Sequence, residues 1–309
     1  MIQASTLLGI DGGGSSTKWA LFSADGAVQG QGRLGSITGH LFGTEDEAAL
    51  RSLLAELADV LQVKPEAVVA GISGLQEHAG PVFQSILADT FGLPERMIRV
   101  MSDLQLAYAA HFAPGEGVLV YAGTGSVACF YTQSGELLRA GGHGYLLGDE
   151  GGAFWQGRQA LRAVLHAQDG GRPLPETLAH ELSLLIGNLD WPQVRAWVYG
   201  GGRGAVATLA PAVYRAALAG DVVAQELMRQ AGLALADIAL TLQKRMASEH
   251  QSGSLPVVLC GGAANNLVRA AFVAVLPGVV QLSPLAPVLG AVRLSPLCMS
   301  SSSPKGVLR

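Results

Sequence analysis

Apolar and polar positions follow two periods along the first third of the chain, and each period predicts one type of element. Short apolar runs rich in β-formers predict a hairpin of strands within residues 7–33. From Thr44 the apolar positions recur at helical spacing, and Thr44 with Glu47 predicts a capping box at the start of that helix. The expected elements are strands over residues 7–10, 19–22, 27–33, 67–72 and 98–101, and helices over residues 44–61, 79–91 and 103–111.

The pattern repeats after the turn-rich stretch at residues 114–117. A strand, a glycine-hydroxyl turn and two further strands follow one another, as they do within residues 7–33. Two units with the same element order predict two similar domains. The expected strands are 118–121, 127–131, 136–140, 255–259 and 279–282, and the expected helices are 153–166, 178–185, 192–198, 206–218, 222–248, 265–276 and 287–294.

Composition limits the class of protein. The 309 residues allow about two domains, and 49% of them are hydrophobic. A net charge of −4 without a basic cluster argues against nucleic acid as a partner. Without a leader-like N-terminus or an uncharged apolar run of membrane length, a cytoplasmic location is expected. The three cysteines, far apart and without a CxxC pattern, suit a reducing compartment.

The stretch at residues 7–22, LLGIDGGGSSTKWALF, carries candidate chemistry. Three glycines between two strands let backbone N–H groups approach an anion, and Ser15 and Thr17 add hydroxyls. Asp11, at the end of the first strand, could hold Mg²⁺. The stretch is neither a Walker A motif nor a dinucleotide fingerprint, because a strand follows the glycines. A glycine-rich turn without a ligand is the alternative interpretation.

Five motifs in order give the chain a resemblance to sugar kinases of the N-acetylglucosamine kinase type. These kinases form part of the BadF/BadG/BcrA/BcrD ATPase family, within the actin and hexokinase superfamily. The motifs are GIDGGGSSTK at 9–18, GISG at 71–74, SDLQLAYAA at 102–110, AGTGS at 122–126 with GGHGYLLGDEGGAFW at 141–155, and LCGGAANN at 259–266.

The resemblance implies an α/β fold of two actin-like (ribonuclease H-like) domains, each a mixed sheet flanked by helices, with a cleft between them. The N-terminal domain would comprise residues 1–116 with 287–309, which include a returning C-terminal helix. The C-terminal domain would comprise residues 117–286, with a helical insertion. A homodimer is also expected from the resemblance.

The resemblance also implies roles for residues in an ATP- and Mg²⁺-dependent reaction. Asp103 would be the general base that accepts the proton of the sugar hydroxyl; a helix N-cap is the alternative role for it. Asp11 would orient the metal. The nucleotide would be bound by Gly12, Gly13, Gly14, Ser15, Thr17, Gly123, Thr124, Gly125, Gly261, Gly262 and Ala263. The sugar would be bound by Asp149 and Gly144, with Ser73, Thr124 and Ser126 as weaker candidates.

One position departs from the family pattern. N-acetylglucosamine kinases carry an Asn before a His in a first-domain loop that binds the sugar, and here the loop has Gly39 before His40. Glycine cannot make an amide's hydrogen bonds. N-acetylglucosamine, glucosamine and N-acetylmuramate therefore stay open as substrates.

The sequence thus predicts an ATP-dependent kinase for an amino sugar, most like N-acetylglucosamine kinase, with the 6-phosphate as product. Two alternatives stay open. The broader family contains ATPase activators of radical dehydratases or aryl-CoA reductases, which hold an iron–sulfur cluster between subunits through cysteines, but Cys129 and Cys260 do not form a convincing pair of ligands. A non-catalytic ATP or sugar sensor would have no need of a base at Asp103. A repressor-type homologue is disfavoured, because no helix-turn-helix segment precedes Leu7.

Overall fold

The chain forms two compact units, each built on one five-stranded sheet. The computed structural model describes residues 6–14, 16–40, 43–249, 255–276, 280–283 and 286–297. Unit 1 comprises Met1–Ala113 with Leu285–Arg309, and unit 2 comprises Pro114–Pro284. Both sheets are mixed and flanked by helices, which confirms the predicted fold class.

The sheet of unit 1 has the strand order β3-β2-β1-β4-β5. Antiparallel pairing joins β1 to β2 and β2 to β3, whereas β4 and β5 extend the sheet in parallel from β1. The register sets Gly12 beside Ile72 and Ile72 beside Ser102, so the three parallel strands end at one edge. The strands are β1 (Leu7–Gly12), β2 (Thr17–Phe22), β3 (Val28–Leu34), β4 (Ala67–Ile72) and β5 (Ile98–Ser102).

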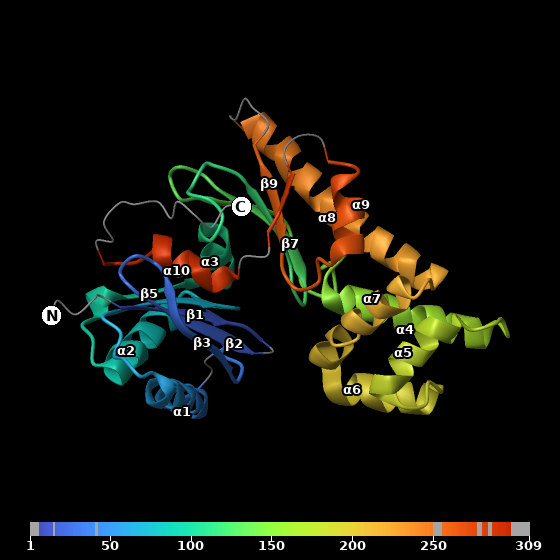
Figure 1. Cartoon of the computed structure of the whole chain (residues 1–309), viewed down its shortest axis with the longest axis horizontal. Coiled ribbons are helices and arrows are strands. Elements are labelled where there is room, and N and C mark those ends of the chain that lie inside the picture. Colours follow the sequence, from blue (N-terminus) through green and yellow to red (C-terminus); the bar gives the residue numbers. More distant parts are fainter. Residues whose placement is uncertain are drawn as a thin grey trace. The chain divides into compact units, whose positions relative to one another are not determined.

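Helices cover both faces of this sheet (Figure 1). Alternate residues of β1 point to opposite faces. Leu8 and Ile10 pack against α1 (Thr44–Val60) and α2 (Ala79–Phe91). Leu7 packs on the other face with α3, η2 and α10. These last elements span Asp103–Ala109, Pro287–Leu289 and Gly290–Arg293, and η1 (Glu95–Met97) precedes β5. The C-terminal segment therefore completes the core of unit 1.

The start of α1 differs from the prediction. The helix begins at Thr44, but the N-cap is Gly43, whose extended backbone leaves the helix without a side-chain cap. The predicted Thr44–Glu47 capping box is therefore wrong, because a capping box needs its hydroxyl at the N-cap position. The N–H of Glu47 instead donates to the carbonyl oxygen of Gly43 at 3.3 Å.

The sheet of unit 2 has the strand order β10-β9-β6-β7-β8. It repeats the scheme of unit 1, since β6, β7 and β8 form an antiparallel meander while β9 and β10 extend the sheet in parallel from β6. The strands are β6 (Val118–Ala122), β7 (Ser126–Tyr131), β8 (Leu137–Gly141), β9 (Val257–Cys260) and β10 (Val280–Leu282).

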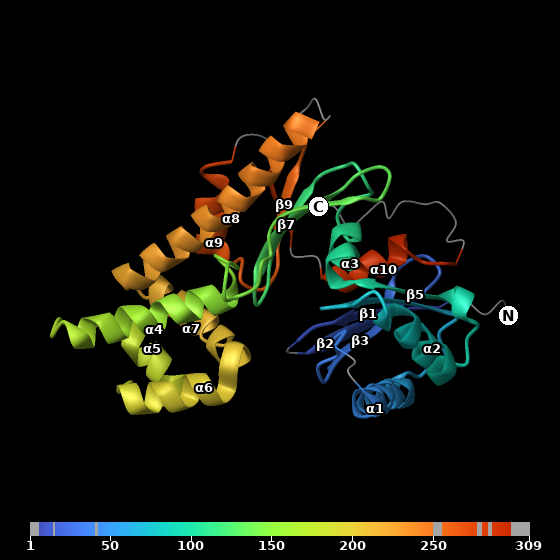
Figure 2. The same cartoon turned by 180° about the vertical axis from the view of Figure 1, so that it is seen from behind.

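The helices of unit 2 bury one large apolar cluster against one face of this sheet. The long helix α8 packs along β6, β7 and β8, with α9 beside it (Figure 2). Across the described residues, no helix combines the length and the apolar character needed to cross a membrane. The helices are α4 (Ala153–Asp169), α5 (Glu176–Ile186), α6 (Trp191–Ala207), α7 (Ala210–Leu218), α8 (Val222–Glu249) and α9 (Asn266–Val273).

The helix predicted over residues 206–218 is wrong in its first turn. Residues 206 and 207 end α6, and α7 begins at Ala210 with Pro211 in its first turn, where the missing N–H of proline is tolerated. The preceding helix was predicted to end at residue 198, but α6 continues past a kink at Gly202. The backbone angles of Gly202, φ 58° and ψ −153°, lie outside the helical region.

Candidate functional site

In unit 1, three polar residues lie at or directly after the carboxyl ends of parallel strands. Asp11 lies at the end of β1, Ser73 directly follows β4, and Asp103 directly follows β5. The N–H of Ser73 donates to the carbonyl oxygen of Gly12 at 2.9 Å, which ties the ends of β1 and β4 together. Ligands of open α/β sheets bind at this kind of edge.

Asp103 is the first residue of α3, and its carboxylate is held in place. Ser102 is the N-cap, since its hydroxyl accepts the N–H of Gln105 at 3.2 Å, so the N-cap alternative for Asp103 is wrong. Oδ1 of Asp103 accepts the N–H of Leu104 at 2.9 Å, and the carboxylate also accepts the hydroxyl of Ser73. Burial raises the pKa of Asp103, and these hydrogen bonds oppose the shift.

Asp11 is the more deeply buried of the two carboxylates. Its pKa is raised to about 6, because burial and the charge of Asp103 together raise it more than the charge of Lys18 lowers it. Two neighbouring carboxylates with raised pKa values would be relieved by a divalent cation. The donor set therefore fits a magnesium ion bound mainly through water.

The turn between β1 and β2 has the features of a phosphate site. The Thr17 hydroxyl is buried and has no hydrogen-bond partner among the described residues. No heavy atom would lie within 4 Å of a Cβ on Gly14, and Ser36 Oγ donates to the carbonyl oxygen of Gly13 at 2.9 Å. Ser15 lies outside the described residues. A buried hydroxyl beside an open glycine turn fits an anionic ligand.

Gly39 and His40 lie beside the Ser73-Gly74 turn. The N–H of Gly39 donates to the carbonyl oxygen of Ser73 at 2.8 Å. A Cβ on Gly39 would lie 2.3 Å from the Cα of Leu75, so this position excludes any larger residue without a backbone shift. The ring of His40 lies over Gly74, with Nε2 2.8 Å from the position of a Cβ there. The loop is thus packed onto the end of β4.

In unit 2, the predicted nucleotide residues lie at the carboxyl ends of β6 and β9. The N–H of Gly123 donates to the carbonyl oxygen of Gly125 at 2.9 Å, which closes a tight turn after β6. After β9, Gly261 has φ +106° and its Cα lies against Ala122, where a Cβ would come within 2.3 Å of the carbonyl oxygen. The N–H of Ala263 donates to the same carbonyl at 2.9 Å, so the two turns are adjacent. Gly262, which lies between Gly261 and Ala263, is exposed.

The turn at residues 123–125 also caps α4. The carbonyl oxygens of Gly123 and Thr124 accept the N–H groups of Ala153 and Phe154 at 2.9 and 3.0 Å. Ser126, predicted as a weaker sugar ligand, is buried, and its Oγ donates to the carbonyl oxygen of Glu150 at 2.6 Å. This hydroxyl holds the loop before α4 in place.

Asp149 lies in that loop and adopts φ 64°, which is rare outside glycine although Asp tolerates it better than most residues. Its side chain is 5% exposed, and Oδ2 accepts Arg203 Nη2 at 3.0 Å. Gly144, the other predicted sugar residue, begins a turn in which its carbonyl oxygen accepts the N–H of Gly148 at 2.8 Å.

Two residues that were not predicted from the sequence, Gln156 and Arg203, make side-chain hydrogen bonds to loops of unit 2. Gln156 is fully buried on α4, and its Nε2 donates to the carbonyl oxygens of Gly151 and Ala263 at 2.9 and 3.0 Å. It joins the loop before α4 to the turn after β9. Arg203 reaches Asp149 from α6. An amide in an apolar helical face was a signal for Gln156, whereas nothing in the local pattern distinguishes Arg203 from other surface arginines.

The structure thus brings the predicted residues together in two groups. Unit 1 collects the glycine turn after β1, Thr17 and the residues Asp11, Gly39, His40, Ser73 and Asp103. Unit 2 collects the turn at 123–125, the turn at 261–263 and the residues Ser126, Gly144 and Asp149.

Known proteins are similar to this chain over most of its length. Residues 8–294 match the BadF/BadG/BcrA/BcrD ATPase family. An N-acetylmuramic acid/N-acetylglucosamine kinase of Clostridium acetobutylicum is 27% identical over 73% of this chain and 75% of its own. The glucosamine kinase GspK of Vibrio cholerae is 25% identical over 84% of this chain and 85% of its own. A crystal structure from Chromobacterium violaceum, provisionally named an N-acetylglucosamine kinase, is 27% identical with a TM-score of 0.71, over 94% of this chain and 99% of that one.

Proposed function

The chain belongs to the BadF/BadG/BcrA/BcrD ATPase family, and from this membership we propose that it is an ATP-dependent kinase that phosphorylates an amino sugar. The names of the relatives from Clostridium acetobutylicum and Vibrio cholerae support this substrate class. The observation that carries the proposal is the carboxylate of Asp103, fixed at the edge of the sheet with its pKa raised by burial.

Asp103 acts as the general base in this proposal. The hydrogen bonds from Ser73 and Leu104 fix the carboxylate without neutralising it. A base with a raised pKa accepts the proton of an attacking sugar hydroxyl more readily than an ordinary carboxylate does. Ser73 is therefore a positioning residue for Asp103.

The remaining residues of unit 1 bind and orient. The glycine turn after β1 and the buried hydroxyl of Thr17 hold phosphate oxygens. Asp11 orients a magnesium ion, which when bound would neutralise charge on the phosphates. In unit 2, the turns at residues 123–125 and 261–263 bind the nucleotide.

N-acetylglucosamine, converted to its 6-phosphate, is the first substrate we propose. Asp149 and Gly144 contact the sugar. Glucosamine and N-acetylmuramate stay in competition with it, because Gly39 is locked against Leu75 and offers no side chain for an N-acetyl group. The proposed mechanism of phosphoryl transfer is the same for each of these sugars.

The buried cysteines argue against an activator with an iron–sulfur cluster between subunits. Cys129 lies on β7 and Cys260 on β9, and both are buried. Burial raises the pKa of the Cys129 thiol and raises that of Cys260 to about 12. Cluster ligands are thiolates, which this environment disfavours. Cys298 lies outside the described residues.

Release of ADP in a coupled assay tests the function. The sugars are N-acetylglucosamine, glucosamine, N-acetylmannosamine, N-acetylmuramate and glucose, each supplied with Mg·ATP. Turnover with an amino sugar supports the proposal and identifies the substrate. Hydrolysis of ATP that is independent of sugar, or no turnover with any sugar, contradicts it.

The variant Asp103→Asn tests the mechanism. We expect it to retain ATP binding and to lose turnover by about 100-fold or more, the range of general-base catalysis. Asp59→Asn is the matched control, since Asp59 is exposed on α1. Substantial turnover by Asp103→Asn would refute the role as base.

A further inference from the structure

The guanidinium of Arg203 is held beside the glycine turn that follows β6. Nη2 donates to Asp149 Oδ2 at 3.0 Å, and the guanidinium carbon lies 5.5 Å from the centre of the Tyr145 ring. A Cβ on Gly125 would lie 2.8 Å from the same Nη2. An ion pair, an aromatic ring and the backbone of the turn thus position one group.

The backbone of α6 is distorted where this arginine begins. Gly202, with its positive φ, breaks the helix immediately before Arg203. Such a conformation favours glycine because other residues are strained there. The kink redirects the chain next to the residue that reaches the loop, and Asp149, on the other side of the ion pair, also has a positive φ. A positive φ is unfavourable for a residue other than glycine, and such a conformation at Asp149 is typical of a functional constraint.

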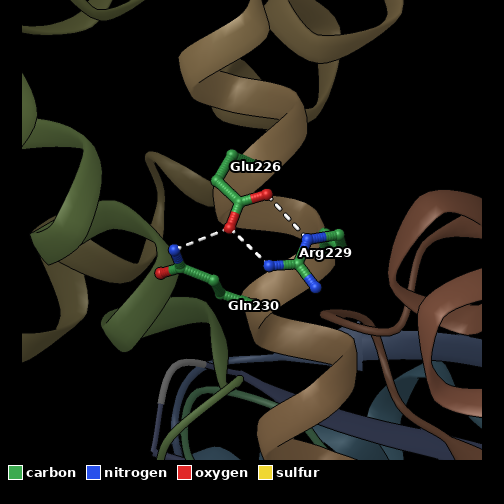
Figure 3. Close-up of polar contacts among 3 residues, drawn as sticks. All are labelled: Glu226, Arg229 and Gln230. Carbon is green, nitrogen blue, oxygen red and sulfur yellow. Dashed lines mark hydrogen bonds and ion pairs between the residues drawn. The ribbon is translucent and has the colours of Figure 1, made fainter. Parts of the chain in front are cut away.

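The ion pair with Asp149 uses only Nη2 among the donor nitrogens of the Arg203 guanidinium, as far as the described residues show. Among the described residues, its only hydrogen-bond partner is Asp149, and 40% of the Arg203 side chain is exposed. Arg229 shows the contrast on α8, where Nε and Nη2 both bind the carboxylate of Glu226 at 2.7 Å (Figure 3). Arg203 therefore keeps N–H donors that the bond to Asp149 does not use, in the forked geometry that suits phosphate oxygens.

We propose that Arg203 binds a phosphate group of the nucleotide at the turn formed by residues 123–125. This inference rests on the proposed function, since it takes that turn as part of the nucleotide site. Asp149 is then also a positioning residue, because its buried carboxylate fixes the guanidinium beside the turn. The ligand class is a nucleoside di- or triphosphate, and the contact is a charge-assisted hydrogen bond.

Binding of ATP, ADP and adenosine by titration calorimetry tests the proposal without using turnover. We expect Arg203→Gln to raise the Kd of ATP by about 10- to 100-fold, as expected for a lost charge-assisted hydrogen bond. The Kd of adenosine, which has no phosphate, should stay within about twofold. Arg195→Gln is the matched control, since Arg195 is exposed on the same helix and loses the same charge.

A second variant separates phosphate binding from support of the loop. Arg203→Gln leaves the buried carboxylate of Asp149 unpaired, which by itself can disturb the loop. The double variant Arg203→Gln with Asp149→Asn removes both charges, and we expect it to bind ATP as poorly as the single variant does. Recovery of ATP binding in the double variant, or equal losses for ATP and adenosine, would overturn the proposal. So would a wild-type protein that binds ATP no better than adenosine.

The kinase proposal and the phosphate contact of Arg203 can be contradicted separately, because different measurements test them. Absence of turnover with every sugar would contradict the kinase, whereas loss of the preference for ATP over adenosine in Arg203→Gln would still support the phosphate contact.

Discussion

At the scale of one residue, the buried carboxylate of Asp11 lowers the free energy of unfolding of the metal-free protein. Its pKa is about 6 in the folded protein, against an ordinary value of 3.8, because burial disfavours the charged form. The metal-free folded state therefore binds more protons than the unfolded state between these two values. Stability is then lost as the pH rises through this window, and the full penalty remains above it.

Replacing Asp11 by asparagine should remove this penalty. We expect Asp11→Asn, without metal, to raise the free energy of unfolding near pH 8 by up to about 3 kcal/mol, the equivalent of the pKa shift. Near pH 4 most of the gain should be gone, because the folded carboxyl is then almost fully protonated and the unfolded carboxyl, with its ordinary pKa of 3.8, is partly protonated as well. Urea unfolding at the two pH values measures the difference.

Two controls accompany this measurement. Asp59→Asn, on the exposed face of α1, should change stability little at either pH. Added Mg²⁺ should stabilise the wild type and not Asp11→Asn. An equal gain at both pH values would show that desolvation of the Asp11 charge is not the cause.

At the scale of elements, Gln156 connects parts of unit 2 that are far apart in sequence. It joins the carbonyl of Gly151, before α4, to that of Ala263, after β9. We expect Gln156→Leu to lower the free energy of unfolding by about 1–3 kcal/mol, because two carbonyl groups lose their buried donor. It should also weaken adenosine binding, because the turn at 261–263 loses its support.

Chemical denaturation and adenosine titration check both effects. Gln159→Leu is the matched control on the same helix, where the Gln159 amide oxygen accepts a hydrogen bond from Nη1 of the exposed Arg162 at 3.1 Å. Its effect on stability should stay within about 0.5 kcal/mol. If the two leucine variants are equally stable, the bridge does not support the fold.

Elements with strong periodicity were predictable from the sequence. The strand at Ala67–Ile72 and the helix at Ala79–Phe91 have the bounds that their apolar patterns predicted. The cap of α1 was not predictable from the Thr44–Glu47 spacing, because the same residues fit a helix that starts one position earlier than the motif requires. Local patterns thus determine an element more reliably than its ends.

The candidate site likewise contains residues that local sequence patterns indicate and one residue that only tertiary contacts place. Glycine turns and a carboxylate at a strand end are local features, so Asp11, Asp103 and the turn at 123–125 could be selected from the sequence. Arg203 acquires its place only through tertiary contacts with a loop 54 residues away. Single-sequence patterns do not report such contacts, and a kinked helix after three glycines resembles an ordinary break.

At the scale of the whole molecule, residues far apart in sequence meet in the core of unit 1. The segment at residues 286–297 packs on β1 and α3 through Val288 and Ala291. The first turn of α10 lies so close to α3 that a Cβ on Gly290 would come within 2.0 Å of the carbonyl oxygen of Leu106. Because α3 begins with Asp103, the C-terminal segment also supports the helix of the proposed base.

Gly290→Ala tests this contact. Replacing glycine by alanine within a helix usually stabilises a protein by roughly 0.5–1 kcal/mol. Gly80→Ala on α2 should show that gain, because no neighbouring heavy atom lies within 4 Å of the position of the added Cβ. At Gly290 the added methyl group must instead displace α10 from α3, so we expect a loss of about 1–3 kcal/mol. Calorimetric unfolding of both variants compares the two sites directly. If Gly290→Ala is as stable as Gly80→Ala, the C-terminal segment is not closely packed on α3, and the support of Asp103 must come from the sheet alone.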